Sequence, residues 1–305
     1  MRLITRSDFD GLVCGMLLME KGIISSWKFV HPKDLQDGLF EAQPTDVLAN
    51  VPYVEGAGMW FDHHASEKER VGWNPDAGGK SHLAPSAAHI IYEYYGGESS
   101  FPPHFKEIVE AADKVDDANL TADEVMNPTG WILLGFICDP RTGLGRFRNF
   151  RISNLQLMEE LILHCRNMPI EELLNQPDVK ERVKMYFEQN ELFKEMLTRY
   201  THTDGNVIVT DLRDVSPIYT GNRFLVYSMF PEQNISCWVV DGRAKINVSI
   251  ACGHSIINRS SKTNVGKLML EYGGGGHERV GTCQVDYDDT DRILGEIVEQ
   301  MKKDG

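Results

Sequence analysis

The stretch that decides the fold stands near the start of the chain, where residues 2–11 read Arg-Leu-Ile-Thr-Arg-Ser-Asp-Phe-Asp-Gly. Arg2–Thr5 is a short apolar run that predicts a strand, and Gly11–Lys21 predicts a helix. Asp8 and Asp10 therefore follow the first strand directly. Ligands of open α/β sheets bind at the carboxyl ends of strands, so this position predicts a site. Two carboxylates one residue apart are costly to bury without a cation.

The first half of the chain alternates short apolar runs with segments of helical periodicity. This alternation is typical of a parallel sheet covered by helices. A charge-rich, mostly helical connector follows from about residue 154. Further strands are predicted at Trp27–Val30, Val47–Asn50 and Met59–Phe61, and helices at Ser86–Tyr95 and Phe105–Val115.

The last third of the chain predicts a smaller α/β domain with a mixed sheet. A helix is expected over Asn264–Tyr272, because apolar side chains recur on one face and Asn264 suits the N-cap. We place the domain boundary between residues 200 and 201, so that the two domains span 1–200 and 201–305. The predicted strands are Asn206–Asp211, Arg223–Met229, Ile235–Val240 and Lys245–Ala251.

The overall composition excludes several classes of protein. The 305 residues include 45 acidic and 31 basic side chains, a net charge of −14, which opposes tight binding of duplex nucleic acid. No apolar run approaches the ~18 residues of a membrane span. The six cysteines form no C-x-x-C pair, which indicates reduced thiols in a cytoplasmic protein.

A second acidic motif, Asp62-His63-His64, follows the apolar run Met59–Phe61. A carboxylate beside imidazoles at a strand end suits Mn²⁺ better than Ca²⁺, which prefers oxygen ligands alone. A third candidate ligand is Asp113, near the end of an otherwise apolar helix. Asp116 and Asp117 are equally plausible from the sequence.

Each acidic motif also has an ordinary explanation when it is taken alone. Asp-x-Asp-Gly after a strand often makes a helix N-cap, Asp-His-His can lie in a solvated loop, and an acidic residue can simply end a helix. The order of the motifs along the chain decides between these interpretations. Two strand ends that carry ligands, followed by an acidic helix end, favour one metal site.

The second domain carries a different signal, Gly273-Gly274-Gly275-Gly276-His277. Consecutive glycines allow left-handed backbone and expose N–H groups that form an anion-binding concavity. The alternative is a helix C-cap, for which one glycine suffices. Upstream, the guanidinium of Arg259 can clamp a phosphate. The predicted phosphate-binding residues are Gly274, Gly275, Gly276, His277, His254 and Arg259.

Together, these motifs resemble the Asp-His-His (DHH) phosphoesterase family, in the branch with a C-terminal type-1 DHH-associated domain. That branch includes nanoRNases, RecJ-type exonucleases and exopolyphosphatase-related proteins. The resemblance spans nearly the whole chain, through Ser7–Gly11, Asp62–His64, Ala111–Asp113 and Gly273–His277. It implies a first domain that holds Mn²⁺, or alternatively Mg²⁺, and a mobile second domain, with the substrate in a cleft between them.

The resemblance also implies a role for each matching residue. Two metal ions would lower the pKa of a bridging water and stabilise both oxygens of an in-line displacement at phosphorus. His64 would lie near the leaving group, and the glycine motif would hold the substrate phosphate. The implied metal ligands are Asp8, Asp10, Asn50, His63 and Asp113, and the implied catalytic residues are Asp62 and His64.

Two positions depart from the family pattern. Ile4 stands where many relatives have a histidine, and Asn50 stands where they have a bridging aspartate. Asparagine ligates through its carbonyl oxygen but brings no charge, so the number of bound ions is expected to be one or two. Arg6 flanks the first motif and is a further candidate for a phosphate contact.

These features lead to one main hypothesis and two alternatives. The main hypothesis is an Mn²⁺-dependent phosphoesterase that cleaves terminal phosphoanhydride or phosphodiester bonds of polyphosphate or of a short oligonucleotide or dinucleotide. Ile4 and Asn50 motivate a phosphate- or nucleotide-binding protein with weakened activity as an alternative. A RecJ-type single-strand exonuclease is the other, and the acidic charge disfavours it. A membrane partner is not expected, and a homodimer is left open.

Overall fold

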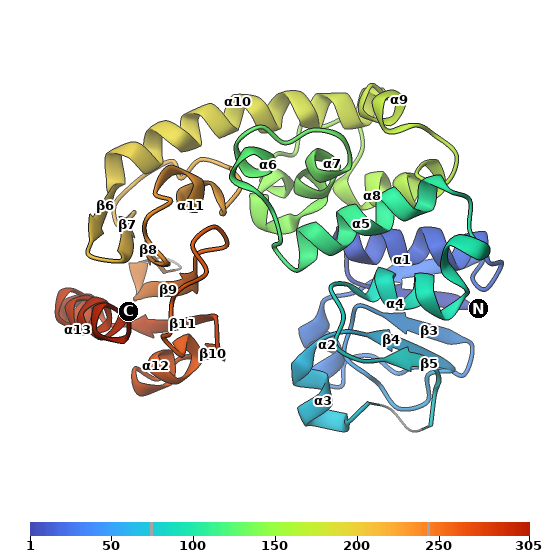
Figure 1. The fold of residues 1–305 in the computed structure, drawn as a ribbon, viewed down its shortest axis with the longest axis horizontal. Coiled ribbons are helices and arrows are strands. Elements are labelled where there is room, and N and C mark those ends of the chain that lie inside the picture. Colours follow the sequence, from blue (N-terminus) through green and yellow to red (C-terminus); the bar gives the residue numbers. More distant parts are fainter. Residues whose placement is uncertain (74–75, 243–244) are drawn as a thin grey trace. The chain divides into compact units, whose positions relative to one another are not determined.

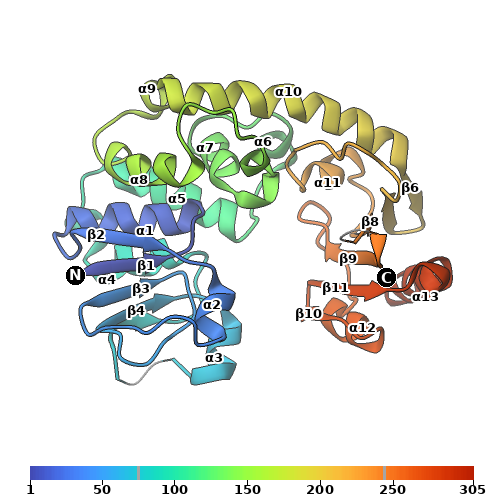
Figure 2. The same ribbon diagram turned by 180° about the vertical axis from the view of Figure 1, so that it is seen from behind.

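The computed structural model describes residues 1–73, 76–242 and 245–305, which form two compact units (Figures 1 and 2). The first unit comprises Met1–Asn119 and Pro128–Met185, and the second comprises Leu120–Asn127 and Tyr186–Gly305. The division falls within the long helix α10 (Pro177–Tyr200). The boundary predicted between residues 200 and 201 lies at the end of that helix, whereas the two units divide between Met185 and Tyr186.

The first unit is built on a five-stranded sheet in which every neighbouring pair is parallel, as the alternation of strands and helices predicts. The strand order is β2-β1-β3-β4-β5, so the carboxyl ends of β1, β3 and β4 meet at one edge. The strands are β1 (Arg2–Thr5), β2 (Ser26–Phe29), β3 (Asp46–Ala49), β4 (Met59–Asp62) and β5 (Gly78–Ser81).

Helices α1, α4 and α5 pack together beside this sheet (Figure 1). The helices of the first unit that lie before the connector are α1 (Phe9–Glu20), α2 (Pro32–Gln36), α3 (Ala65–Val71), α4 (Ala87–Tyr94), α5 (His104–Asp116) and α7 (Gly130–Cys138). The predicted helical connector contains α8 (Asn154–His164), α9 (Ile170–Leu174) and α10.

The sheet of the first unit buries apolar side chains on both faces. Leu3 of β1 belongs to the larger core with α1, whereas its neighbour Ile4 belongs to a smaller core with Leu48 and Trp60. Successive side chains of a strand point to opposite faces, which explains the division. The side chain of Ile4 is therefore buried in that smaller core.

The second unit contains a six-stranded sheet in the order β10-β11-β9-β8-β7-β6. Only β7 and β8 run parallel among its pairs in the described residues, so the sheet is mixed, as predicted. Its strands are β6 (Thr201–Asp204), β7 (Val207–Asp211), β8 (Ile235–Asp241), β9 (Val248–His254), β10 (Gly275–His277) and β11 (Val280–Val285). Its remaining helices are α6 (Ala122–Met126), α11 (Leu225–Met229), α12 (Val265–Glu271) and α13 (Thr290–Asp304).

The strand predicted at Arg223–Met229 is wrong, because Leu225–Met229 forms the short helix α11. Leu225, Val226 and Tyr227 are all buried, and a short, fully buried apolar run has no periodicity that separates strand from helix. The N-cap predicted at Asn264 is confirmed, since its side chain accepts the N–H of Lys267 at 3.0 Å.

The structure shows the state of the cysteines and the character of the helices, both of which the sequence analysis addressed. All six cysteines are buried free thiols, as predicted for a chain without a disulfide framework. Among the described residues, none of the helices combines the length and apolar character that crossing a bilayer requires.

Candidate active site

The turn between β1 and α1 places both carboxylates of the first motif. Asp8 is the N-cap of α1, and its Oδ1 accepts the N–H of Gly11 at 3.0 Å. Asp10 follows in the first helical turn and is buried. A Cβ on Gly11 would lie 2.1 Å from the carbonyl oxygen of Arg6, so only glycine fits this close approach.

Asp10 is held by the N-terminus of α4. Its two oxygens accept the N–H groups of Ala87 at 3.0 Å and Ala88 at 2.8 Å. The partial positive charge of a helix N-terminus stabilises a carboxylate at this position. Burial nevertheless raises the pKa of Asp10 to about 7, and the negative charge of Asp116 adds to the rise. The positive charge of His63, whose Nε2 lies 3.8 Å from Asp10 Oδ2, opposes that rise.

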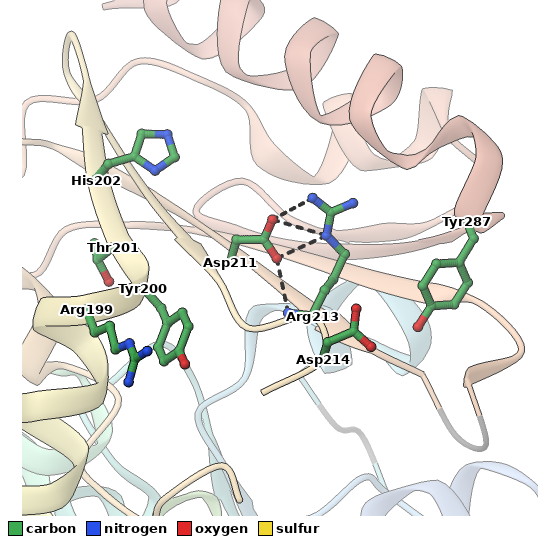
Figure 3. Close-up of a pocket in the computed structure, with 8 residues that line it drawn as sticks. All are labelled: Arg199, Tyr200, Thr201, His202, Asp211, Arg213, Asp214 and Tyr287. Carbon is green, nitrogen blue, oxygen red and sulfur yellow. Dashed lines mark hydrogen bonds and ion pairs between the residues drawn. The ribbon is translucent and has the colours of Figure 1, made fainter. Parts of the chain in front are cut away.

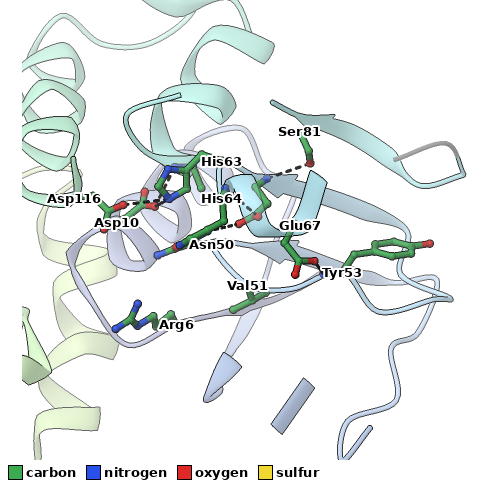
Figure 4. Close-up of polar contacts among 12 residues, drawn as sticks. Arg6, Asp10, Asn50, Val51, Tyr53, His63, His64, Glu67, Ser81 and Asp116 are labelled. Atoms are coloured by element: carbon green, nitrogen blue, oxygen red, sulfur yellow. Dashed lines mark hydrogen bonds and ion pairs between the residues drawn. The ribbon is translucent and has the colours of Figure 1, made fainter. Parts of the chain in front are cut away.

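His63 and Asp116 complete a cluster with Asp10 (Figure 4). The Nε2 atom of His63 lies 3.1 Å from Asp116 Oδ2 and 3.8 Å from Asp10 Oδ2. One potential ligand atom from each of the three residues lies within 4.8 Å of the others, and no other such group occurs in residues 1–73, 76–242 and 245–305. We refer to these three residues as the ligand cluster.

The orientation of His63 suits a metal ligand. Its Nδ1 atom lies 3.1 Å from the carbonyl oxygen of Ala84, so in the neutral ring Nδ1–H donates and Nε2 keeps its lone pair. Nε2 faces the carboxylates of Asp10 and Asp116, and the side chain is only 10% exposed. Metal-bound histidines commonly donate their other N–H to a backbone carbonyl in this way. Together with two carboxylates, the cluster fits a divalent cation.

We expect metal binding to release protons near neutral pH. Burial lowers the pKa of His63, but the adjacent Asp116 and the charge of Asp10 outweigh it and raise that pKa to about 10. His63 of the metal-free protein is thus protonated at neutral pH, and a metal ion must displace that proton. Mn²⁺ affinity is expected to rise with pH until about pH 10, the pKa of His63 in the metal-free protein. Calorimetric titrations in buffers of different ionisation enthalpy measure the release, and a buffer-independent heat would contradict it.

Asp113, the ligand that the resemblance implies, is placed elsewhere. Its carboxylate accepts the hydroxyl of Ser86 at 2.6 Å and lies 2.8 Å from Nδ1 of His89, so it braces the N-terminus of α4. Asp116, one of the two alternatives, takes the place in the ligand cluster. Residues three apart on a helix lie on nearly the same side, which is why the sequence does not separate them. Asp117 is the C-cap of α5.

Asp62 and His64 form a separate pair at the end of β4. Asp62 is fully buried, and its Oδ1 lies 2.9 Å from Nδ1 of His64, while its Oδ2 accepts the His64 N–H at 3.2 Å. The His64 side chain is 43% exposed. Burial lowers the pKa of His64, but the bond to Asp62 outweighs it and raises the pKa above its usual value. An exposed, oriented imidazole with a raised pKa is suited to donate a proton.

Asn50, which stands where relatives have a bridging aspartate, lies beside Asp8. It adopts a left-handed backbone with a φ of 56°, which asparagine tolerates, and its amide donates to Asp8 Oδ1 at 2.9 Å. The other oxygen, Asp8 Oδ2, forms an ion pair with Arg6 Nε at 3.0 Å. Asp8 and Asn50 are outside the ligand cluster.

Arg141 is a site residue that the sequence reasoning missed. Its Nε lies 2.8 and 3.0 Å from the two oxygens of Asp139. Burial raises the pKa of Asp8, and the positive charges of Arg6 and Arg141 oppose that rise, so both arginines face the acidic centre. Its only sequence signal is Asp139-Pro140-Arg141, a turn directly after an apolar helix.

A pocket of about 870 Å³ adjoins the centre and shares Arg6 and Arg141 with it. Its wall combines cationic groups with aliphatic and aromatic side chains, a composition that suits a phosphorylated aromatic ligand. We refer to it as the Arg6 pocket. It is lined by Arg6, Ser7, Lys28, Phe29, Val30, His31, Pro32, Asp34, Leu35, Leu39, Phe40, Pro140 and Arg141.

The glycine run of the second unit is divided between two structural tasks. The N–H of Gly273 donates to Leu270 O at 3.1 Å and that of Gly274 to Met269 O at 2.9 Å, so both close the C-terminus of α12. Gly275–His277 is the edge strand β10, paired with β11. Helix capping therefore uses the N–H groups of Gly273 and Gly274, and of these only Gly274 is a predicted phosphate-binding residue.

Steric requirements also differ along this glycine run. A Cβ on Gly274 would lie 2.1 Å from Thr282 O, and one on Gly276 would lie 2.2 Å from Val280 O. These two glycines thus allow the close approach of β11. A Cβ on Gly275 would meet nothing within 4 Å, so packing within the chain does not explain that glycine. An open side at Gly275 is what a substrate group would need.

The remaining predicted phosphate ligands lie in the same unit. His277 and Arg259 are exposed, and Arg259 Nε donates to Ile256 O at 3.1 Å. His254 Nε2 lies 2.8 Å from Thr263 O, so one of its ring nitrogens is engaged by the backbone. His277 and Arg259 are more exposed than His254, which is partly buried.

A second pocket, of about 610 Å³, contains none of the predicted site residues (Figure 3). Its central cation, Arg213, pairs with Asp211 at 2.6 Å and with Asp291 at 2.7 Å. That neutralisation makes Arg213 a poor anchor for an anionic substrate. The pocket is lined by Arg199, Tyr200, Thr201, His202, Asp211, Arg213, Asp214 and Tyr287.

Comparison with known proteins identifies the family. No protein-family model matches the chain, and no curated protein matches it. A solved structure, the pGpG-specific phosphodiesterase PggH from Vibrio cholerae, is 47% identical, with a TM-score of 0.89, over 100% of this chain and 99% of that one. The chain belongs to the DHH phosphoesterase family. It is a hydrolase of α/β fold, as the motifs predict.

More distant DHH structures share the fold of this phosphoesterase. A DHH domain from a protein described as a member of a family of ribosomal proteins is 13% identical, with a TM-score of 0.54, over 99% of this chain and 86% of that one. RecJ from Thermus thermophilus, solved with Mn²⁺, is also 13% identical, with a TM-score of 0.51. The match covers 99% of this chain but 52% of RecJ. At such identities the similarity concerns the fold alone.

Proposed function

We propose that this DHH phosphoesterase cleaves the phosphodiester bond of a short linear dinucleotide that carries a 5′-phosphate, with pGpG as the leading candidate and Mn²⁺ as the metal ion. The observation that carries the proposal is the 47% identity, over the full chain, to a phosphodiesterase described as pGpG-specific. This relationship favours a dinucleotide over polyphosphate or long single strands.

The ligand cluster and the Asp62–His64 pair supply the chemistry of the proposed reaction. Asp10, His63 and Asp116 would hold the divalent ion, which would supply a water nucleophile at neutral pH. Asp62 orients His64, whose exposed imidazole donates a proton to the leaving ribose oxygen. His277 and Arg259, with the open side of Gly275, are proposed to bind a substrate phosphate.

The Arg6 pocket supports a nucleotide as the substrate. The ring of Phe40, with Lys28 Nζ 5.4 Å from its centroid, offers an apolar surface beside a positive charge. A base can stack on such a ring while a 5′-phosphate pairs with the cation. In a chain of net charge −14, this local positive group is the kind of feature that a small anionic substrate requires.

The test compares three substrates with purified protein and either Mn²⁺ or Mg²⁺. We expect pGpG to be converted to GMP, and GpG without the 5′-phosphate to react with kcat/KM lower by about 10-fold or more, the effect of one lost charged contact. Polyphosphate should release no phosphate. Phe40→Ala should raise KM for pGpG more than it lowers kcat.

Asp10→Asn, purified in the same way, controls for contaminating nucleases. Faster release of phosphate from polyphosphate than of GMP from pGpG would overturn the assignment, as would the absence of pGpG turnover with both metals.

A further inference from the structure

The two carboxylates at the end of β1 have different electrostatic partners. Asp10 belongs to the ligand cluster, where Nε2 of His63 lies 3.8 Å from its Oδ2. Oδ1 of Asp8 accepts from Gly11 N–H at 3.0 Å and from the Asn50 amide at 2.9 Å. Its Oδ2 pairs with Arg6 Nε at 3.0 Å. Asp8 therefore has an arginine as its positive partner, whereas Asp10 faces the potential metal ligands His63 and Asp116.

The surroundings of Asp8 offer no second set of metal ligands. Asn50 presents its amide N–H to Asp8, and a donor group does not bind a cation. Ile4, in the strand before the motif, is fully buried in the core with Leu48 and Trp60. Within the parts of the chain that the structure describes, the only group of three potential ligands is the one at Asp10.

Arg6 remains accessible to a ligand while it is held in place. Its side chain is 30% exposed, whereas that of Asp8 is 7% exposed. Arg6 also lines the Arg6 pocket together with Arg141, so the guanidinium lies between the acidic centre and the space for a substrate. Figure 4 shows Arg6 on the loop between β1 and α1, with the ligand cluster at the start of that helix.

We infer that this enzyme works with a single divalent ion at Asp10, His63 and Asp116, and that Arg6 replaces a second ion as the positive charge on the Asp8 side. Asp8 and Asn50 position the guanidinium, which contacts a non-bridging oxygen of the scissile phosphate. A guanidinium is always charged and pairs with phosphate through fixed N–H groups, so it can stabilise charge that develops during the displacement. The inference rests on the proposed function only for the identity of the substrate.

The first test counts metal ions without any activity measurement. Apo protein is saturated with Mn²⁺, separated from free ion by gel filtration and analysed for metal and protein content. We expect about one Mn²⁺ per chain, with the electron paramagnetic resonance spectrum of an isolated ion. Two tightly bound ions per chain, or a spectrum of an exchange-coupled pair, would overturn the inference.

The second test converts the arginine side of the centre into a metal site. In the double variant Arg6→Ala/Asn50→Asp, Asp8 loses its cation and gains a second carboxylate. We expect this variant to bind an additional Mn²⁺, whereas Arg6→Ala alone should keep about one. An unchanged metal count in a folded double variant would contradict the claim that Arg6 and Asn50 exclude the second ion.

The third test examines the charge of Arg6 during turnover. Arg6→Ala should lower kcat by about 10²–10³-fold, the usual effect of removing one group that stabilises the transition state, with a smaller change in KM. Free guanidinium should restore part of the loss. Arg166→Ala, which breaks a 2.8 Å ion pair with Glu20 at the far end of α1, is the matched control and should keep its activity.

Failure of the inference is distinguishable from failure of the proposed function. Two bound ions, or an Arg6→Ala variant with normal kcat, would contradict the inference even if the enzyme hydrolyses pGpG. One bound ion without hydrolysis of pGpG would contradict the proposed substrate but support the inferred number of metal ions.

Discussion

Asp116→Asn is expected to abolish metal-dependent turnover, whereas Asp113→Asn is expected to retain most of it. Asp116 contributes one of two carboxylates to the ligand cluster, so its neutral analogue removes half of the negative charge that holds the ion. Loss of the metal's contribution costs several kcal/mol of transition-state stabilisation, on the order of 10³-fold in rate.

Asp113 contacts Ser86 and His89, and neither belongs to the ligand cluster. An asparagine oxygen can still accept a hydrogen bond there, so the loss should stay below the roughly 10- to 100-fold typical of direct partners of metal ligands. Mn²⁺ titration and kcat/KM of both purified variants make the comparison. A loss of metal binding in Asp113→Asn with normal binding in Asp116→Asn would reverse the assignment.

Gly11→Ala is expected to unfold the turn that builds the centre. The added Cβ would lie 2.1 Å from Arg6 O and 2.7 Å from Thr5 Oγ1, and the first of these atoms is backbone that cannot rotate away. Relief requires the turn between β1 and α1 to shift, which displaces Asp8 and Asp10 together. We expect the free energy of unfolding to fall by about 2–4 kcal/mol and Mn²⁺ affinity to fall by about 10-fold or more.

The matched control for this substitution is Gly295→Ala, inside α13, where an added Cβ meets nothing within 4 Å. Alanine there should stabilise the protein by about 0.5–1 kcal/mol, because glycine is unfavourable within a helix. Urea denaturation and Mn²⁺ titration of both variants provide the measurement. Equal stability of Gly11→Ala and the unchanged protein would show that the turn accommodates a side chain.

Sequence reasoning succeeded where the signal was local and periodic. The strand predicted at Arg2–Thr5 matches β1 residue for residue, and the N-cap at Asn264 forms as expected. A short apolar run flanked by polar turn residues has few alternatives in a parallel sheet. The run at Arg223–Met229 failed for the corresponding reason, because full burial removes the alternation that marks a strand.

The site was predictable only in part. The order of Asp8–Gly11 and Asp62–His64 at two strand ends led to the DHH family, which the full-length similarity to PggH confirms. Asp116 was distinguishable from Asp113 only in three dimensions, since both lie on the same side of α5. Arg141 carries almost no sequence signal, because its position near Asp8 depends on how α7 packs against α1 and α5.

Local patterning was thus enough to establish the fold class, the family and the presence of acidic and imidazole groups at the strand ends. Strand and helix periodicities and motif order are properties of neighbouring residues, which is why they can be recognised in the chain alone. The folded molecule was needed to establish which carboxylates share a centre with His63 and that Arg6 neutralises Asp8. Both features depend on how segments far apart in the chain pack against one another. Charged side chains become partners only when they lie within a few ångströms, and the sequence alone does not give those distances.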